Sequence, residues 1–323
     1  MRWSVESWDP AYGLPGEALD LDDTSADVVV DIEVAAAAWA PLDVPPPGAP
    51  PGGTGVVFVD GVRRVDARAW VHGPDGSVAP ALCATYGAGA VRCLPGVARR
   101  AGEAPTGASA RIAAALIERG LFTASPQALD VHTRAGDYAV RAVGSTRTEA
   151  LPLALQARMA ELEIAAAEAA CDGGGDLLVV DGPLRGRGHL PNAVGFIKTH
   201  QVAYLPPAQH AVVGALEAGQ RTPVFATGTA FARYACYLRL PGALSTPWAG
   251  VVRLEVPADL DVPVAVALVE RAAGVLPRYA SQSHKEPRAP QNLYPIAGLE
   301  RELRRRLGDE ALLYRALRRA AAA

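Results

Sequence analysis

Hydrophobic residues in this sequence gather in short dense runs that are separated by polar, glycine-rich and proline-rich stretches. Two of these runs share one arrangement: VVFV at residues 56–59 and LLVV at residues 177–180 are each followed directly by Asp-Gly. Four successive apolar residues indicate a strand that is buried on both faces. Asp-Gly is a common turn dipeptide, so each run is expected to end in a turn.

The remaining pattern predicts further strands and several helices. A Gly-Pro-Asp-Gly turn is expected at 73–76, and Pro152 fits the first turn of the longest helix, which Gly173 to Gly175 should end. The order predicts an α/β fold with a mixed sheet that begins as a β-meander. Strands are expected over 62–72, 77–93, 128–143, 193–198, 222–227, 233–240 and 250–256, and helices over 108–119, 147–171, 207–218, 262–275 and 298–320.

The first 55 residues differ from the rest of the chain. They begin with an acidic segment, and residues 35–55 are rich in Ala, Pro and Gly, which is typical of a linker or surface loop. Trp39 is the residue best able to pack locally. We therefore expect an N-terminal segment over 1–55 and a main domain over 56–323. No signal-peptide pattern and no apolar run of bilayer length is present, which favours a cytoplasmic protein.

Composition narrows the possible functions. Half of the 323 residues are hydrophobic and the formal net charge is −3, so any contact with nucleic acid must come from local clusters of positive charge. The chain has no Walker motif, no G-x-G-x-x-G and no G-x-S-x-G, which argues against an NTPase, a Rossmann dehydrogenase or a common serine hydrolase. The four cysteines form no C-x-x-C pair and are expected to be buried thiols. Four histidines, His72, His132, His200 and His210, show no metal-ligand spacing.

Asp60 and Asp181 are the first candidates for chemistry because each follows a buried strand. Two carboxylates held close together repel each other unless a divalent cation joins them, and Mg²⁺ and Mn²⁺ prefer such oxygen ligands. Either motif alone indicates a plain turn. Their repetition gives the metal-site hypothesis equal standing with the turn.

A third carboxylate comes from the helix over 147–171. Glu163 lies between Leu162 and Ile164, where a carboxylate must be solvated, paired or bound to metal. We favour Glu163 as a ligand, with Glu161 as the close alternative. For Glu161 and Glu168, a position on the wet face of the helix is at least as well supported.

Positive charge is expected beside this site. Lys198, one of only two lysines in the chain, ends an apolar segment and is suited to phosphate contact or charge stabilisation. Arg185 and Arg187 lie in the Gly-rich loop after Asp181, and either DNA contact or simple solvation fits them equally. The polar loop over 281–295 is a candidate for substrate contact through His284, or else a surface connection.

These segments resemble the NurA nuclease family. The motifs FVDGVRR, LLVVDGPL, VGFIKT and LYP occur in the family's order over residues 56–300. The resemblance implies an RNase H-like mixed β-sheet flanked by helices, with extra β and helical insertions. It implies metal ligands at Asp60, Glu163 and Asp181, and places Lys198 and Tyr294 in the active site. Many relatives carry His or Asp after the Tyr-Pro motif, where this chain has none. Glu300, Glu302 or His284 are the alternatives for that fourth ligand.

The resemblance also implies a function. Family members are Mn²⁺-dependent, or Mg²⁺-dependent, DNA nucleases that act as homodimers beside a hexameric HerA-type translocase in end resection for double-strand break repair. Hydrolysis would use two ions about 3.5–4 Å apart. Expected activities are 5′–3′ exonuclease and single-strand endonuclease. The alternatives are a catalytically weak platform that regulates the HerA ATPase, another RNase H-like ribonuclease or resolvase, or a small-molecule phosphoesterase. The expected DNA contacts are Arg63, Arg64, Arg185, Arg187, Lys198 and Arg288.

Overall fold

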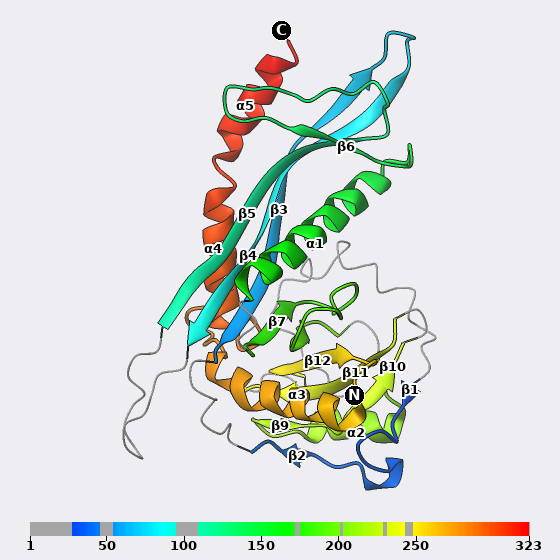
Figure 1. Ribbon diagram of the computed structural model, residues 1–323, viewed down its shortest axis with the longest axis vertical. Coiled ribbons are helices and arrows are strands. Elements are labelled where there is room, and N and C mark those ends of the chain that lie inside the picture. Colours follow the sequence, from blue (N-terminus) through cyan, green and yellow to red (C-terminus); the bar gives the residue numbers. More distant parts are fainter. Residues whose placement is uncertain are drawn as a thin grey trace, which may run out of the picture. The chain divides into compact units, whose positions relative to one another are not determined.

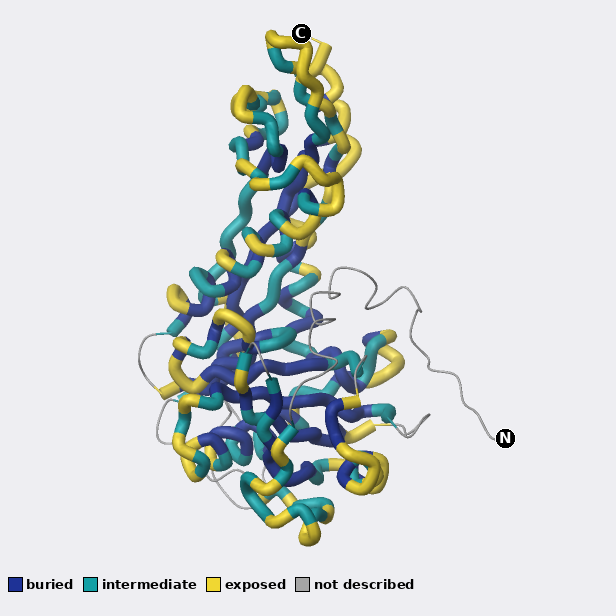
Figure 2. Tube along the Cα trace, turned by 90° about the vertical axis from the view of Figure 1, so that its right-hand side faces the viewer, coloured by how far each residue is buried: buried dark blue, intermediate teal, exposed yellow. Residues whose placement is uncertain are grey.

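The computed structural model describes residues 28–45, 54–94, 109–171, 175–200, 203–228, 231–242 and 248–322. The chain divides into two compact units, each built from three segments. Figure 2 colours each residue by burial, and both units contain buried residues in their interior. The first unit holds Met1–Phe58, Val91–Arg111 and Cys171–Ala297, and the second holds Val59–Ala90, Ile112–Ala170 and Gly298–Ala323.

The first unit is built around a mixed sheet. Its strands lie in the order β1-β10-β11-β12-β8-β7, and β7 is followed by the first residues of β3. The β7–β8 pair is parallel, whereas β8, β12, β11 and β10 pair antiparallel. Sequence patterning predicted most of these strands correctly. In this order the strands are β1 (Val28–Val29), β10 (Phe225–Thr227), β11 (Arg233–Arg239), β12 (Val251–Pro257), β8 (Ala193–Ile197) and β7 (Leu177–Asp181).

Two helices cover this sheet. Helix α3 (Val262–Val275) packs against β8, β11 and β12 and buries Leu268 and Val269 (Figure 1). Helix α2 (Pro207–Ala215) contributes Val213 to a second cluster with Phe225 and Tyr237. A short helix, η3 (Leu276–Tyr279), follows α3. Because apolar side chains leave water on both faces, the central strands carry almost no exposed surface.

The segment that patterning marked as acidic and linker-like belongs in part to the first unit. Strand β1 pairs with β10, and β2 (Leu42–Asp43) pairs with β9 (Gln220–Arg221). Trp39, after the short helix η2 (Ala36–Ala38), packs on Phe225 with ring centroids 6.2 Å apart and donates its indole N–H to Val30 O at 3.0 Å. Residues 28–43 are thus built into the sheet, while the Pro-rich residues 46–53 lie outside the described part.

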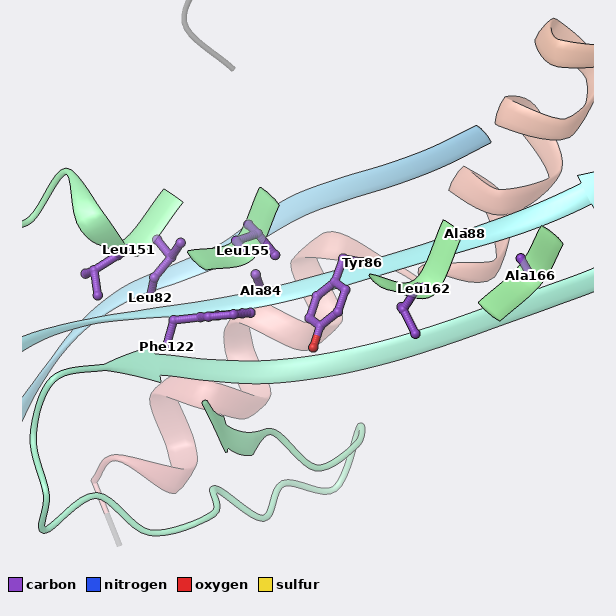
Figure 3. Packing of buried hydrophobic residues seen from close by; sticks show 9 residues of the cluster. All are labelled: Leu82, Ala84, Tyr86, Ala88, Phe122, Leu151, Leu155, Leu162 and Ala166. Carbon is purple, nitrogen blue, oxygen red and sulfur yellow. The ribbon is translucent and has the colours of Figure 1, made fainter. Parts of the chain in front are cut away.

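The second unit is a sheet with helices on both faces. Its strands lie in the order β3-β4-β5-β6, and helix α1 (Ala150–Ala170) packs across one face (Figure 1). Leu155 and Leu162 of α1 meet Tyr86 and Phe122 of the sheet (Figure 3). The strands are β3 (Val56–His72), β4 (Val78–Leu94), β5 (Ser109–Thr123) and β6 (Ala139–Ala142).

Helices α4 (Tyr294–Arg306) and α5 (Glu310–Ala320) replace the single helix expected over 298–320. Gly308 separates them with a φ of 85°, and the Asp309 side chain caps α5 by accepting from Leu312 N at 2.7 Å. Leu317 of α5 packs with Cys83 and Leu121 on the sheet face opposite to α1. No helix of the described residues is long and apolar enough to cross a membrane.

Three predictions about this unit differ from the structure. Residues 109–119 form strand β5, not a helix, because Leu121 and Phe122 at its end fill the cores on opposite faces of the sheet and the strand is held between them. That arrangement overrides the helix propensity of the Ala-rich sequence. Residues 56–72 form one continuous strand, so Asp60-Gly61 is not a turn. The strand expected over 128–143 is reduced to β6 and a bridge between Val131 and Tyr138.

Candidate active site

Asp181 and Lys198 form a mostly buried ion pair in the first unit. Asp181 is the last residue of β7, where the buried strand emerges from the core, and Gly182 turns the backbone with a φ of 102°. Lys198 follows β8, the parallel neighbour of β7. Its ammonium donates to Asp181 Oδ2 at 2.6 Å and to Asn292 Oδ1 at 3.1 Å. The predicted Asp-Gly turn is confirmed here.

The second oxygen of Asp181 differs from the first. Within the described residues, Asp181 Oδ1 is buried and has no hydrogen-bond partner. A buried carboxylate oxygen without a protein donor is costly, which indicates a position suited to a cation. Carboxylate and amide oxygens are also the ligand types that Mg²⁺ and Mn²⁺ prefer. Asp181 Oδ1 is therefore one oxygen that fits a divalent ion, while the Lys198 ammonium occupies Asp181 Oδ2 and Asn292 Oδ1.

The loop after Asp181 is held by the strands beneath it. Gly195 permits this, because a Cβ there would lie 3.0 Å from both Gly182 O and Leu184 N. Leu184 N donates to Glu255 Oε2 at 3.3 Å. Arg187 is buried and donates to Pro183 O at 2.8 Å, so it shapes the loop. Arg185 is exposed and remains the better candidate for DNA contact in this loop.

The other two predicted ligands belong to the second unit. Asp60 lies in β3, and its Oδ1 accepts from Gly61 N at 2.8 Å. Glu163 lies in α1 with only 5% of its surface exposed. The Glu163 carboxylate rests against Gly61, because a Cβ at Gly61 would approach Glu163 Oε1 well inside the 3.0 Å that real Cβ atoms keep. Within this unit, Glu163 therefore lies beside the residue that follows Asp60.

The two alternatives to Glu163, Glu161 and Glu168, lie on the exposed surface of helix α1. Glu161 is exposed and forms an ion pair with Arg158 on the helix surface. Glu168 is also exposed. Arg158 bridges to Glu118 at 2.8 Å, so Glu161 belongs to a surface network of charges. Because Glu161 and Glu168 are exposed and Glu163 is buried, burial favours Glu163 as the candidate ligand.

The polar loop over 281–295 carries the Tyr-Pro motif. The Tyr294 hydroxyl accepts from Gln282 N at 3.2 Å, and the Lys285 ammonium lies 5.9 Å from the Tyr294 ring centroid. His284 is exposed. Arg288 donates to Glu286 Oε1 at 3.2 Å, which leaves it less available to DNA than predicted.

The remaining candidates have structural partners. Glu300 pairs with Arg304, and Glu302 pairs with Arg305 and Arg306, as i,i+3 and i,i+4 helix pairs. Neither glutamate therefore gains support as a fourth ligand.

Arg63 and Arg64, the two predicted DNA contacts that follow Asp60, differ in their exposure and in their hydrogen-bond partners. Arg64 donates to Asp66 at 2.8 Å and to Gly308 O at 2.8 Å, so it joins β3 to the turn between α4 and α5. Arg63 is exposed and hydrogen-bonds Gln156 of α1. Of the two, Arg63 is the better candidate for DNA contact.

Three of the four cysteines, Cys83, Cys93 and Cys236, are buried as the sequence predicted, and Cys171 is half-buried. No disulfide joins the four cysteines, and burial raises the pKa of Cys83 and Cys93 to about 11. His200 stacks near Trp248 and Tyr237, with its Nε2 2.9 Å from Val251 O. Burial, with a further contribution from the charge of Arg253, lowers the pKa of His200 to about 4. The half-buried imidazole of His200 is therefore neutral near pH 7.

Sequence reasoning missed Asn292. It is a neutral residue in a loop rich in turn-forming residues, so its type gave no sign of function. Its neighbour Tyr294 was the only local signal. Within the described residues, no group of three or more His, Cys, Asp and Glu side chains is gathered as a metal site. Asp181 belongs to the first unit, and Asp60 and Glu163 belong to the second.

Comparison with known families adds one match. The family model of the NurA domain matches residues 96–305, which is more than half of the chain. The matched range contains Glu163, Asp181, Lys198 and Asn292, and it begins after Asp60. Asp60 is therefore supported by its strand motif and not by this match. No curated protein matches the chain significantly.

Proposed function

The chain belongs to the NurA domain family, a family of nucleases associated with HerA, and from this premise we propose a metal-dependent deoxyribonuclease that acts on DNA ends. In this proposal the activities are 5′–3′ exonuclease and single-strand endonuclease, used in end resection for double-strand break repair. The protein would work as a homodimer beside a HerA-type translocase. The observation that carries the metal dependence is the buried Oδ1 of Asp181, which has no hydrogen-bond partner among the described residues.

We propose Asp60, Glu163 and Asp181 as the residues that hold Mn²⁺ or Mg²⁺. Each offers carboxylate oxygens; Asp60 and Asp181 each follow four buried apolar residues, and Glu163 is itself buried in helix α1. Bound divalent ions would supply Lewis-acid stabilisation of the charge that develops on the phosphodiester oxygens. Within the second unit, β3 and α1 carry Asp60 and Glu163, and within the first unit β7 carries Asp181. Regular elements of this kind hold ligand side chains more precisely than loops do.

Lys198 supplies the fixed positive charge of the proposed site. Its ammonium is held on Asp181 at 2.6 Å, with 15% of the side chain exposed. A partly desolvated cation beside the scissile phosphate stabilises negative charge more strongly than a solvated one. Arg63 and Arg185, both exposed, would contact the DNA backbone outside this point.

The proposal is tested by cleavage of end-labelled single-stranded and duplex DNA with Mn²⁺, Mg²⁺ or EDTA. We expect metal-dependent cleavage that Asp60→Asn, Glu163→Gln and Asp181→Asn each reduce by about a hundredfold or more. Glu161→Gln is the matched control, since it removes a carboxylate from the same helix two residues away and should leave cleavage intact. Binding of Mn²⁺ to each variant, measured by calorimetry, separates loss of the ion from misfolding.

Other outcomes would redirect the assignment. A wild-type protein that stays inactive with a translocase present would favour the regulatory platform. Preferential cleavage of RNA–DNA hybrids or four-way junctions would favour another RNase H-like nuclease. Cleavage that survives all three substitutions would show that the ligand set is wrong.

A further inference from the structure

Asn292 lies at the end of the polar loop, two residues before Tyr294, and is completely buried. Its Oδ1 accepts a hydrogen bond from the Lys198 ammonium at 3.1 Å. The same ammonium donates to Asp181 Oδ2 at 2.6 Å. Lys198 is therefore held by two acceptors that come from different parts of the first unit, one from a strand end and one from the loop.

The other end of the Asn292 amide has a different environment. Within the described part of the chain, Asn292 Nδ2 is buried and has no hydrogen-bond partner. A buried donor without a partner costs free energy, and a leucine of similar size would avoid that cost. An asparagine at this position is therefore explained by what its Oδ1 does, which is to accept from Lys198.

The backbone around Asn292 keeps its side chain in place. Asn292 N donates to Arg288 O at 3.0 Å, which closes the turn that precedes the residue. The next residue, Leu293, is also completely buried. The Asn292 amide is thus held by the closed turn before it and by the buried segment after it, so it can restrain a flexible partner. The Gln291 side chain bonds a different group, Val251 O, at 3.5 Å.

We propose that Asn292 is a positioning residue that fixes the Lys198 ammonium against Asp181. A lysine amine sits on four rotatable carbons, and a single carboxylate partner lets it pivot around that carboxylate. A second, immobile acceptor removes this freedom. In this role Asn292 does not contact the substrate. Its structural part stands by itself, and its catalytic part rests on the nuclease function proposed above.

The catalytic part predicts a particular kinetic pattern. Asn292→Leu should lower kcat about 10- to 100-fold with little change in KM for DNA, since misplacing one group by about 1 Å costs on that order. Asn292→Asp keeps an acceptor for Lys198 and should recover much of kcat. Gln291→Leu, the adjacent buried amide, is the matched control and should retain wild-type kcat.

A double-mutant cycle then asks whether Asn292 acts through Lys198. In a Lys198→Met background, Asn292→Leu should have no further effect on kcat. Independent, multiplicative losses would overturn the proposal. If Asn292→Leu does not fold, Asn292→Ser, whose shorter side chain withdraws the acceptor from the Lys198 ammonium, provides the same comparison.

A second measurement does not depend on activity. The chain contains only two lysines, Lys198 and Lys285, so selective isotope labelling of lysine side chains gives one NMR signal from each. We expect Asn292→Leu to shift and broaden the Lys198 signal while the Lys285 signal and the Gln291→Leu spectrum stay as in wild type. An unmoved Lys198 signal would overturn the inference even if the protein is a nuclease. A moved signal in a protein without nuclease activity would support the positioning role and reject the proposed function alone.

Discussion

The Glu163 carboxylate lies where the side chain of residue 61 would be if residue 61 were not glycine. A Cβ at Gly61 would meet Glu163 Oε1 and would lie 3.0 Å from Met159 Cγ, both on helix α1. Gly61 has no positive φ and sits inside a continuous strand. The glycine is therefore needed for close approach of α1 to β3, and this approach brings Glu163 next to the residue that follows Asp60.

Gly61→Ala should disturb the proposed ligands more than the fold. Overpacking of this kind costs about 1–3 kcal/mol of stability, and displacement of Glu163 should reduce metal-dependent cleavage about tenfold or more. Cleavage rates and thermal melting measure the two effects. Gly298→Ala in helix α4 is the control, because a Cβ at Gly298 would meet nothing within 4 Å. It should leave cleavage unchanged and keep or slightly raise stability. Equal activity in both variants would contradict this role for Gly61.

Lys198→Met should lower kcat while DNA binding in the absence of added metal changes little, because the lysine acts at one phosphate and the backbone contacts elsewhere remain. We expect a loss of about 10²–10³-fold, as for removal of one preorganised donor. The exposed lysine gives the control, and Lys285→Met should keep wild-type kcat. A large rise in KM with unchanged kcat would instead assign Lys198 to general DNA binding.

Glu33→Gln should destabilise the first unit. Glu33 bonds Arg221 at 2.6 Å, and Arg221 is only 2% exposed, so the substitution leaves a buried guanidinium with weaker compensation. We expect a loss of about 2 kcal/mol, below the range for fully buried pairs because Glu33 is only half-buried. Chemical denaturation measures it, with Glu302→Gln on the surface of α4 as a control that should have no effect.

The same glutamate predicts acid sensitivity. Burial acts to raise the pKa of Glu33, but the hydrogen bonds from Arg221 and Val224 N outweigh it, so the pKa is lowered overall. The stability that Glu33 contributes is present above its unfolded pKa and is lost as pH falls through the folded value. In Glu33→Gln this part of the pH dependence should disappear. An unchanged acid transition would show that other groups cause it.

His200 predicts a second pH effect at milder acidity. Its folded pKa is about 4, below the ordinary value of 6.5, so the unfolded chain takes up a proton on this residue between those values while the folded chain does not. Stability should therefore be complete above pH 6.5 and fall by about 2 kcal/mol between about pH 6.5 and pH 5. Melting of His200→Gln across this range should show a shallower slope. The exposed His132→Gln should keep the wild-type slope.

Much of the first unit could be predicted because its strands are apolar on both faces. The LLVV run before Asp181 is fully buried, as its pattern required, and the following glycine turns as expected. Helix α3 has the predicted bounds. At Asp60 the Asp-Gly pair wrongly predicted a turn. The strand continues through Gly61, because the glycine there leaves space for helix α1.

The rest depended on contacts distant in sequence. Strand β5 has helix-forming composition, and its conformation is set by its place between β4 and β6 in the sheet and by the two cores that Leu121 and Phe122 fill. Arg64 and Arg187 were predicted DNA contacts because they are basic and near the motifs, but each is bonded to backbone carbonyls. Asn292 had no pattern to mark it, since its role arises from a lysine 94 positions away.

The division of the chain into two units has a consequence for its evolution. Neither unit is a continuous stretch of sequence, and the boundaries fall inside β3, β4 and β5 as well as within α4. No truncation at either end frees one unit whole, and no exchange of a single gene segment could replace one unit while leaving the other complete. The carboxylates of the second unit and the Asp181–Lys198 pair of the first are therefore expected to be inherited as one block, with recombination breakpoints tolerated only outside it.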